Sequence, residues 1–149
     1  MLQHQRRVQV LYADAKVGDL RFLTNWATQF SFDFTPVDLS PYDIREKIQE
    51  ADKEGRQFDV LLIESEYFDR VMGIMTPLYG LDIIHELANL FEEHQIAVVV
   101  LSVYDRYIGP GDFPEKVGEL LRTGLVDLCF TKPLAHKRQW EQLRAVASQ

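Results

Sequence analysis

The sequence predicts a doubly wound α/β domain, with five parallel strands in the order 2-1-3-4-5 and helices on both faces of the sheet. Five short apolar segments alternate with five segments whose apolar residues recur at helical spacing. Two of the apolar segments, 60–63 and 96–101, are unbroken, as in strands that are buried on both faces. The length of 149 residues suits one core, so residues 1–149 are expected to form a single domain.

The first strand is expected at residues 8–13, where the sequence is mostly apolar and ends just before an aspartate. Residues 19–30 carry apolar side chains at helical spacing and predict a first helix with one face toward the sheet. Residues 32–37 alternate loosely between apolar and polar side chains and predict the second strand.

The second helix has clear start and stop signals. Ser40 suits the N-cap, and Pro41 suits the first helical position because proline lacks the N–H that is unpaired there. Gly55 ends this helix. Residues 58–63 then predict the third strand, which stops abruptly at the carboxylate of Glu64.

Residues 65–79 show no clear period and are expected to form a long, partly ordered loop, which in a compact domain is usually functional or flexible. Because it carries aromatic and methionine side chains, this loop is also a candidate interaction surface. The alternative is that these side chains fold back over the edge of the sheet and join the core. Residues 80–93 predict the third helix. Residues 96–101 predict the central strand, which Ser102 follows directly.

A second long loop is expected over residues 104–114, leading into a fourth helix at 113–122. Gly124 ends that helix. Residues 125–130 predict the fifth strand, and residues 140–147 carry the apolar side chains of the last helix. Five strands alternating with helices predict the flavodoxin-like strand order given above.

The overall composition excludes several classes of protein. A net charge of −7 argues against nucleic acid as the main partner, and no apolar run approaches the length of a membrane span. Cys129 is the only cysteine, so an internal disulfide is excluded, and its apolar neighbours predict a buried thiol. A cytoplasmic location is the default expectation.

Four polar side chains lie at or just after the ends of expected strands, namely Asp14, Glu64, Ser102 and Lys132. In the order 2-1-3-4-5 the strands that carry them are neighbours, and their carboxyl ends meet at one edge of the sheet. Each residue alone could simply begin a loop. Two acids, a hydroxyl and an ammonium that converge on one crevice instead predict a site.

With these four residues in place, the chain resembles the CheY-like receiver domains of bacterial two-component response regulators. The resemblance covers nearly the whole chain, and its most specific piece is Lys132-Pro133 after the fifth strand. It implies that Glu64 stands where the family's phosphoacceptor aspartate belongs, and that Ser102 is the switch hydroxyl. The segments that carry the resemblance are 10–14, 59–64, 77–84, 98–102 and 124–133.

Three departures from the family's pattern predict a pseudo-receiver. Glu64 is one methylene longer than aspartate, so the geometry for in-line phosphoryl transfer is lost. Asp14 is flanked by alanines where the family has an acidic pair, so Mg²⁺ should bind weakly, if at all, and no other cofactor is expected. Cys129 occupies the position of the family's aromatic switch residue.

The expected function is a non-enzymatic signalling module that binds proteins, with Glu64 paired to Lys132 and the domain held in one state. The resemblance implies a signalling protein or a histidine kinase as partner. It also implies a homodimer through the face made by the fourth helix, the fifth strand and the fifth helix. The alternative for the Glu64–Lys132 pair is an incidental, partly solvated contact worth under about 1 kcal/mol.

Two other functions stay open. The first is an atypical but phosphorylatable, Mg²⁺-dependent receiver that forms an acyl phosphate on Glu64, Glu66 or Asp69. The second is a flavodoxin-like protein that binds a flavin or a nucleotide. The turn at 14–19 argues against the second, because it lacks the glycine- and hydroxyl-rich sequence that cradles a phosphate.

Overall fold

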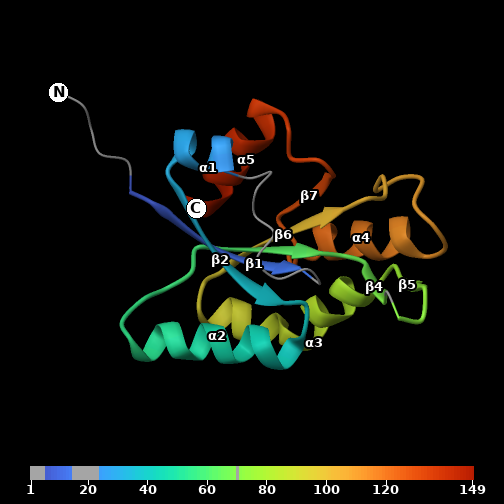
Figure 1. Ribbon diagram of the computed structural model, residues 1–149, viewed down its shortest axis with the longest axis horizontal. Coiled ribbons are helices and arrows are strands. Elements are labelled where there is room, and N and C mark those ends of the chain that lie inside the picture. Colours follow the sequence, from blue (N-terminus) through green and yellow to red (C-terminus); the bar gives the residue numbers. More distant parts are fainter. Residues whose placement is uncertain (1–5, 15–23, 70) are drawn as a thin grey trace.

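The computed structural model describes residues 6–14, 24–69 and 71–149 (Figure 1). Apart from the β4–β5 hairpin, its helices and strands alternate in the expected order. They are β1 Val8–Asp14, α1 Thr24–Phe30, β2 Phe32–Asp38, α2 Pro41–Lys53, β3 Val60–Glu64, β4 Tyr67–Asp69, β5 Ile74–Thr76, α3 Tyr79–Glu93, β6 Ala97–Ser102, α4 Phe113–Arg122, β7 Leu128–Thr131 and α5 Lys137–Ala147.

The main sheet has five parallel strands in the order β2-β1-β3-β6-β7. With the separate β4–β5 pair left out, this is the order 2-1-3-4-5, so the predicted fold class is confirmed. The register aligns Glu64 with Leu101 and Ser102 with Thr131, which brings the carboxyl ends of β3, β6 and β7 to one edge.

Two apolar layers enclose the sheet, because successive strand residues point to opposite faces. One layer packs residues such as Leu61, Ile63 and Val100 against α2, α3 and α4. The other packs Val60, Leu62 and neighbouring strand residues against α1 and α5, with Trp140 fully buried. Figure 1 shows α1 and α5 on one side of the sheet and α2 and α3 on the other. No helix among the described residues is long and apolar enough to cross a membrane.

The start and stop residues predicted for the second helix are confirmed at α2. The Ser40 hydroxyl accepts a hydrogen bond from the Asp43 N–H at 3.4 Å, and Pro41 begins the helix. Gly55 follows with a φ of +74°, a conformation that glycine adopts without strain. Other helix and strand boundaries differ from the expected ones by a few residues. The first helix is described from Thr24 onward, and residues 19–23 of its expected span, 19–30, lie outside the described residues.

The prediction of a loop over residues 65–79 is wrong in part, because β4 and β5 form an antiparallel hairpin within this segment. Its turn is closed by Asp69, whose side chain accepts hydrogen bonds from the N–H groups of Val71 and Met72. Gly73 then adopts a φ of +66°. Each strand has three residues, and all three of β5 are exposed, so neither strand shows the alternation that reveals a strand in a sequence.

Gly80 is the closest approach between α3 and the end of β3. A Cβ atom on Gly80 would lie 1.9 Å from the carbonyl oxygen of Glu64, a contact that real structures do not tolerate. The Gly80 N–H also donates to the carbonyl of Ser65 at 2.7 Å. The start of α3 therefore fixes the backbone that carries Glu64 and Ser65.

Replacing Gly80 with alanine is expected to lower the free energy of unfolding by at least about 2 kcal/mol, because two backbone segments must separate. Urea unfolding monitored by circular dichroism would measure the loss. Gly118 is a matched control within α4, where a Cβ meets nothing within 4 Å. Gly118→Ala is expected to stabilise the protein by about 0.5–1 kcal/mol. Equal effects of the two substitutions would contradict the close-approach account.

Candidate functional site

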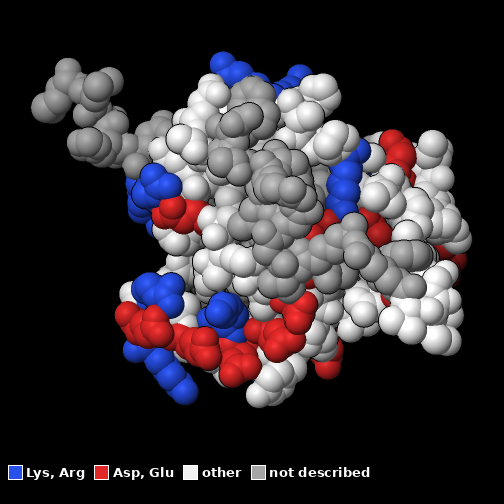
Figure 2. Space-filling view, viewed as in Figure 1, with Lys and Arg blue, Asp and Glu red and all other residues white. Residues whose placement is uncertain are grey.

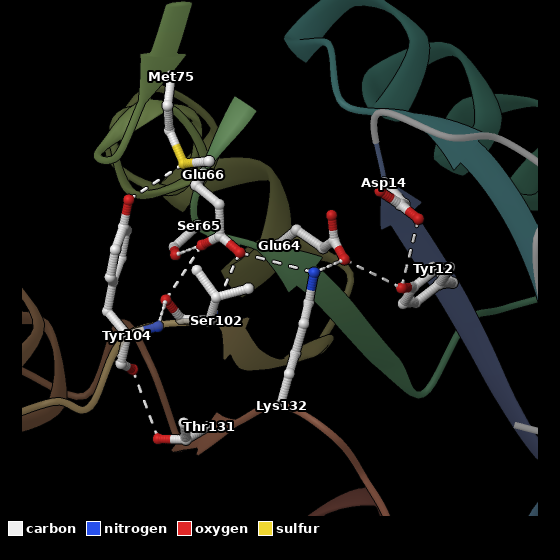
Figure 3. A network of polar contacts seen from close by, with 11 residues as sticks. Tyr12, Asp14, Glu64, Ser65, Glu66, Met75, Ser102, Tyr104, Thr131 and Lys132 are labelled. Carbon is white, nitrogen blue, oxygen red and sulfur yellow. Dashed lines mark hydrogen bonds and ion pairs between the residues drawn. The ribbon is translucent and has the colours of Figure 1, made fainter. Parts of the chain in front are cut away.

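The four side chains predicted at the strand ends do come together at one edge of the sheet (Figure 3). Asp14 ends β1, Glu64 ends β3, Ser102 ends β6, and Lys132 follows β7 by one residue. The two acids and Ser102 are buried, whereas the Lys132 side chain keeps 26% of its surface exposed. The Lys132 N–H donates to the carbonyl of Ser102 at 2.7 Å, which fixes the lysine beside the site.

The Lys132 ammonium lies between two buried carboxylates. It pairs closely with Glu64 Oε1, and its Nζ lies 3.5 Å from Glu66 Oε1. The expected contact between Glu64 and Lys132 is therefore present, and a second acid shares the same cation. Two buried carboxylates beside one ammonium make the lysine the main source of positive charge for both.

Glu66 is a central residue of this site, although the sequence predicted it only as one of three acids that could form an acyl phosphate. Its carboxylate accepts hydrogen bonds from the Ser65 hydroxyl, from the Ser102 hydroxyl at 3.0 Å and from the Val103 N–H at 3.1 Å. With Lys132 these donors satisfy both oxygens of a side chain that is 6% exposed. Figure 3 shows this carboxylate at the centre of the contacts, between β6 and the lysine.

Ser65 positions Glu66 through its backbone as well as its hydroxyl. Its N–H donates to Leu101 of β6 at 3.1 Å, and its carbonyl accepts from Gly80 at the start of α3. The chain turns out of β3 at this residue, which is fully buried. That turn points the Glu66 side chain toward Ser102.

Tyr12 lies on the other side of Glu64. Its hydroxyl is 3.3 Å from Glu64 Oε1 and 3.5 Å from Asp14 Oδ2 (Figure 3). Burial, followed by the nearby Glu64 and Asp14 carboxylates, raises the pKa of the Tyr12 hydroxyl far above its ordinary value. The tyrosine therefore stays protonated and acts as a donor to one of the acids.

Glu64 itself is a poor site for negative charge. Burial and its hydrogen bond with Asp14 raise the pKa of Glu64 to about 8, although the Lys132 ammonium opposes the shift. Burial disfavours the charged form of a carboxyl group, and a neighbouring acid does the same. Near neutral pH the protonated form of Glu64 is therefore favoured.

This shift predicts an unusual pH dependence of stability. An acid whose pKa is raised in the folded state keeps its proton while the unfolded chain loses it, so stability falls as pH rises between 4.5 and about 8. Glu64→Gln removes that dependence. The stability of the wild type relative to Glu64→Gln is expected to fall by on the order of 2 kcal/mol across this range. Urea unfolding of both proteins at several pH values would measure the difference, and a constant difference would contradict the assignment.

The described residues do not fit a Mg²⁺ site. No group of three or more His, Cys, Asp or Glu side chains in the described part of the chain is arranged to hold a metal ion. The Asp14 and Glu64 carboxyl groups form hydrogen bonds with each other and with the Tyr12 hydroxyl. The Lys132 ammonium forms an ion pair with Glu64. Mg²⁺ needs near-octahedral oxygen ligands, so weak binding at Asp14 stays a prediction.

Cys129 lies in β7, opposite Val100 of β6, and is half-buried against the apolar layer of α2, α3 and α4. Burial raises the pKa of its thiol to about 11, so the thiol is protonated and unreactive near neutral pH. Cys129 is thus an apolar packing residue at the position where the resemblance implies an aromatic side chain.

Tyr104 connects the site to the hairpin. Its N–H donates to the Ser102 hydroxyl at 3.0 Å, and its own hydroxyl donates to Met75 Sδ of β5 at 3.0 Å. Its ring packs edge-on against Phe113 at the start of α4, with 5.6 Å between ring centroids. The contacts from Glu66 to the exposed hairpin therefore run through Ser102 and Tyr104 (Figure 3).

Three residues of this site were not identified as such from the sequence, namely Tyr12, Ser65 and Tyr104. Tyr12 is the only polar-tipped side chain within β1 that points into its apolar layer, and this position was a usable signal. Glu66 appeared only as one of several acids that could carry an acyl phosphate. Its two-residue spacing from Glu64 was visible, but its partners depend on the turn at Ser65.

Comparisons with solved structures show the fold. The chain matches a two-component response regulator from Cytophaga hutchinsonii with a TM-score of 0.64 and 19% identity, covering 97% of this chain and all of the other. It matches the signal receiver domain of an HD domain-containing protein from Pseudomonas fluorescens Pf-5 with a TM-score of 0.60 and 13% identity, covering 99% and 92%. Both have about the same extent as this chain.

A third match is to a CheX-CheY-BeF3-Mg²⁺ complex from Borrelia burgdorferi, with a TM-score of 0.56 and 18% identity over 95% of this chain and 87% of the other. No protein-family model and no curated protein sequence matches. At identities below 20% these structures establish the fold alone. The chemistry of the site has to be argued from its own residues. The chain therefore has the fold of the CheY-like receiver domains.

Proposed function

We propose that this chain is a signal-transduction module of the receiver type that acts by binding proteins and does not take a phosphoryl group in the usual manner. The main support is the position of Glu66. Its carboxylate occupies the space between the Ser102 hydroxyl, the Val103 N–H and the Lys132 ammonium. The resemblance implies that the serine and the lysine are groups that would otherwise meet a phosphoryl group.

Glu64 adds a second argument. A nucleophilic carboxylate must be ionised and aligned with its target, whereas burial and Asp14 favour the protonated form of Glu64. Its Oε1 also already pairs with Lys132. A phosphoryl group that arrived at Glu64 would have to displace both this contact and the Glu66 carboxylate. The same internal contacts would hold the domain in one state.

The partner in this proposal is another signalling protein or a histidine kinase. One candidate surface is the face of α4, β7 and α5, which the resemblance implies. Signalling then depends on whether the partner is present, since the state of the domain is fixed. The module has no catalytic group in this account.

Intact-mass spectrometry after incubation with acetyl phosphate and Mg²⁺ tests the proposal. A receiver domain with the usual aspartate, treated in parallel, serves as the positive control. We expect no added phosphoryl mass on this chain. A labile phosphoryl adduct that maps to Glu64, Glu66 or Asp69 would overturn the proposal and favour the phosphorylatable alternative.

A further inference from the structure

The exposed apolar side chains of this molecule are concentrated in one region. The described residues include eight large hydrophobic side chains that are exposed, and seven of them lie in the β4–β5 hairpin or in the segment between β6 and α4. The eighth, Tyr42, is on α2. Single exposed apolar residues are common on protein surfaces, but a cluster of this kind marks an interaction site. The seven residues, called the hairpin surface below, are Val71, Met72, Ile74, Met75, Val103, Tyr107 and Ile108.

The two parts of the hairpin surface are joined to each other. The Tyr104 hydroxyl donates to Met75 Sδ at 3.0 Å, which ties the segment after β6 to β5. Figure 1 places the hairpin at the margin of the molecule, beside the segment that leads into α4. Figure 2, in the same orientation, shows mostly uncharged side chains over that margin, whereas acidic side chains gather over α2.

β5 is an unprotected edge strand. It pairs with β4 on one side, and in the described residues no backbone hydrogen bond links it to any other segment. All three of its residues are exposed. Proteins usually protect such an edge with a charge or a proline within the strand, and Ile74, Met75 and Thr76 provide neither.

We propose that β5 pairs with β5 of a second copy of this chain. The two strands run antiparallel about a twofold axis, so that the two hairpins form one four-stranded sheet. A twofold contact is self-complementary, and each copy offers the other an equal row of backbone donors and acceptors. The flanking side chains of Val103, Tyr107 and Ile108 extend the contact around the strand pair.

Charge repulsion between two copies is weak at β5. The molecule carries a net charge of −7, which opposes self-association in general, but residues 71–77 include no charged side chain. The face of α4, β7 and α5 includes none of the exposed large hydrophobic residues in the described part of the chain. The contact involves two three-residue strands, so we expect a dimer with a dissociation constant on the order of micromolar.

Sedimentation equilibrium of the full chain over a range of concentrations tests this proposal. We expect a monomer–dimer equilibrium that Ile74→Lys weakens at least about tenfold, because the twofold axis brings the two added charges close together. Ile74→Lys should not destabilise the monomer, because the added ammonium lies opposite the acidic residue Asp69 in β4. Tyr42→Lys is the matched control on α2 and should leave the dimer unchanged. Thr76→Lys is a second variant of the same exposed strand, for use if Ile74→Lys does not fold.

Hydrogen exchange at the same concentrations identifies the contact. Amides of residues 74–76 should become protected as the dimer forms, and those of α5 should not. A chain that stays monomeric at every concentration would overturn the proposal, as would a dimer that Ile74→Lys and Thr76→Lys leave intact. The proposal goes beyond the signalling function and is independent of whether the site takes a phosphoryl group, since neither readout involves phosphate.

Discussion

Replacing Lys132 with methionine is expected to lower the free energy of unfolding by about 2–3 kcal/mol while leaving the fold intact. The lysine is the cation beside both Glu64 and Glu66, and these carboxylates are each 6% exposed. Removing one partner from a buried ion pair typically costs about 3–5 kcal/mol, and the partial exposure of Lys132 reduces that figure. Methionine keeps the length and apolar stem of the side chain, so the loss reports on the charge.

Urea unfolding measures this loss, and Lys116→Met is its matched control. Lys116 pairs with Asp82 at 2.9 Å, but both side chains are more than one third exposed. Exposed pairs contribute less than about 1 kcal/mol, so the control should change stability little. Equal losses in the two variants would mean that the pair is incidental.

Glu66→Ala is the second substitution with a large expected effect, a loss of about 2–4 kcal/mol. It leaves the buried hydroxyls of Ser65 and Ser102, and the N–H of the half-exposed Val103, without their acceptor. Each buried donor without a partner costs about 1–3 kcal/mol, although water can enter the space and reduce the sum. Thermal or urea unfolding would measure the loss.

Glu54→Ala is the matched control, because Glu54 pairs with Arg56 where both side chains are 59% exposed. It should cost less than about 1 kcal/mol. Glu66→Ala should also move the amide signals of Val103 and Tyr104 in an NMR spectrum, since Ser102 links the carboxylate to Tyr104. A Glu66 variant as stable as the Glu54 variant would show that the carboxylate is dispensable.

Much of this fold could be predicted from the sequence because its signals are local and strong. The unbroken apolar segment at 96–101 became the buried strand β6, and Ser40 and Pro41 began α2 as expected. The positions of Asp14, Glu64, Ser102 and Lys132 followed from the ends of those strands and the strand order. Their convergence required only that parallel strands share one edge.

The hairpin could not be predicted in the same way. β4 and β5 have three residues each, and β5 has no buried face to impose alternation. The one usable signal was its turn, where Asp69 caps the N–H groups that follow and Gly73 supplies a positive φ. Of the aromatic and methionine side chains in this segment, Met72 and Met75 are exposed, whereas Tyr67 stacks on Tyr79 with ring centroids 5.2 Å apart.

Glu66 was hard to interpret for a different reason. An acid two residues after a strand is usually solvated, and its burial here depends on three tertiary contacts. Ser65 bonds to β6 and to α3, Gly80 permits the close approach of α3, and Ser102 and Val103 provide the donors. None of these contacts is local in sequence. The expectation that an acid paired with Lys132 holds the domain in one state was therefore made for Glu64, while Glu66 makes more hydrogen bonds.

The central claim is that the protein's own carboxylate fills this pocket and fixes one state. The most direct test is an amide ¹H–¹⁵N NMR spectrum recorded before and after addition of Mg²⁺ and acetyl phosphate. The account predicts that the Val103 signal stays in place, because Glu66 remains bound to its N–H. A new Val103 signal that grows in with acetyl phosphate, together with a shift at Tyr104, would contradict it and show that the domain switches.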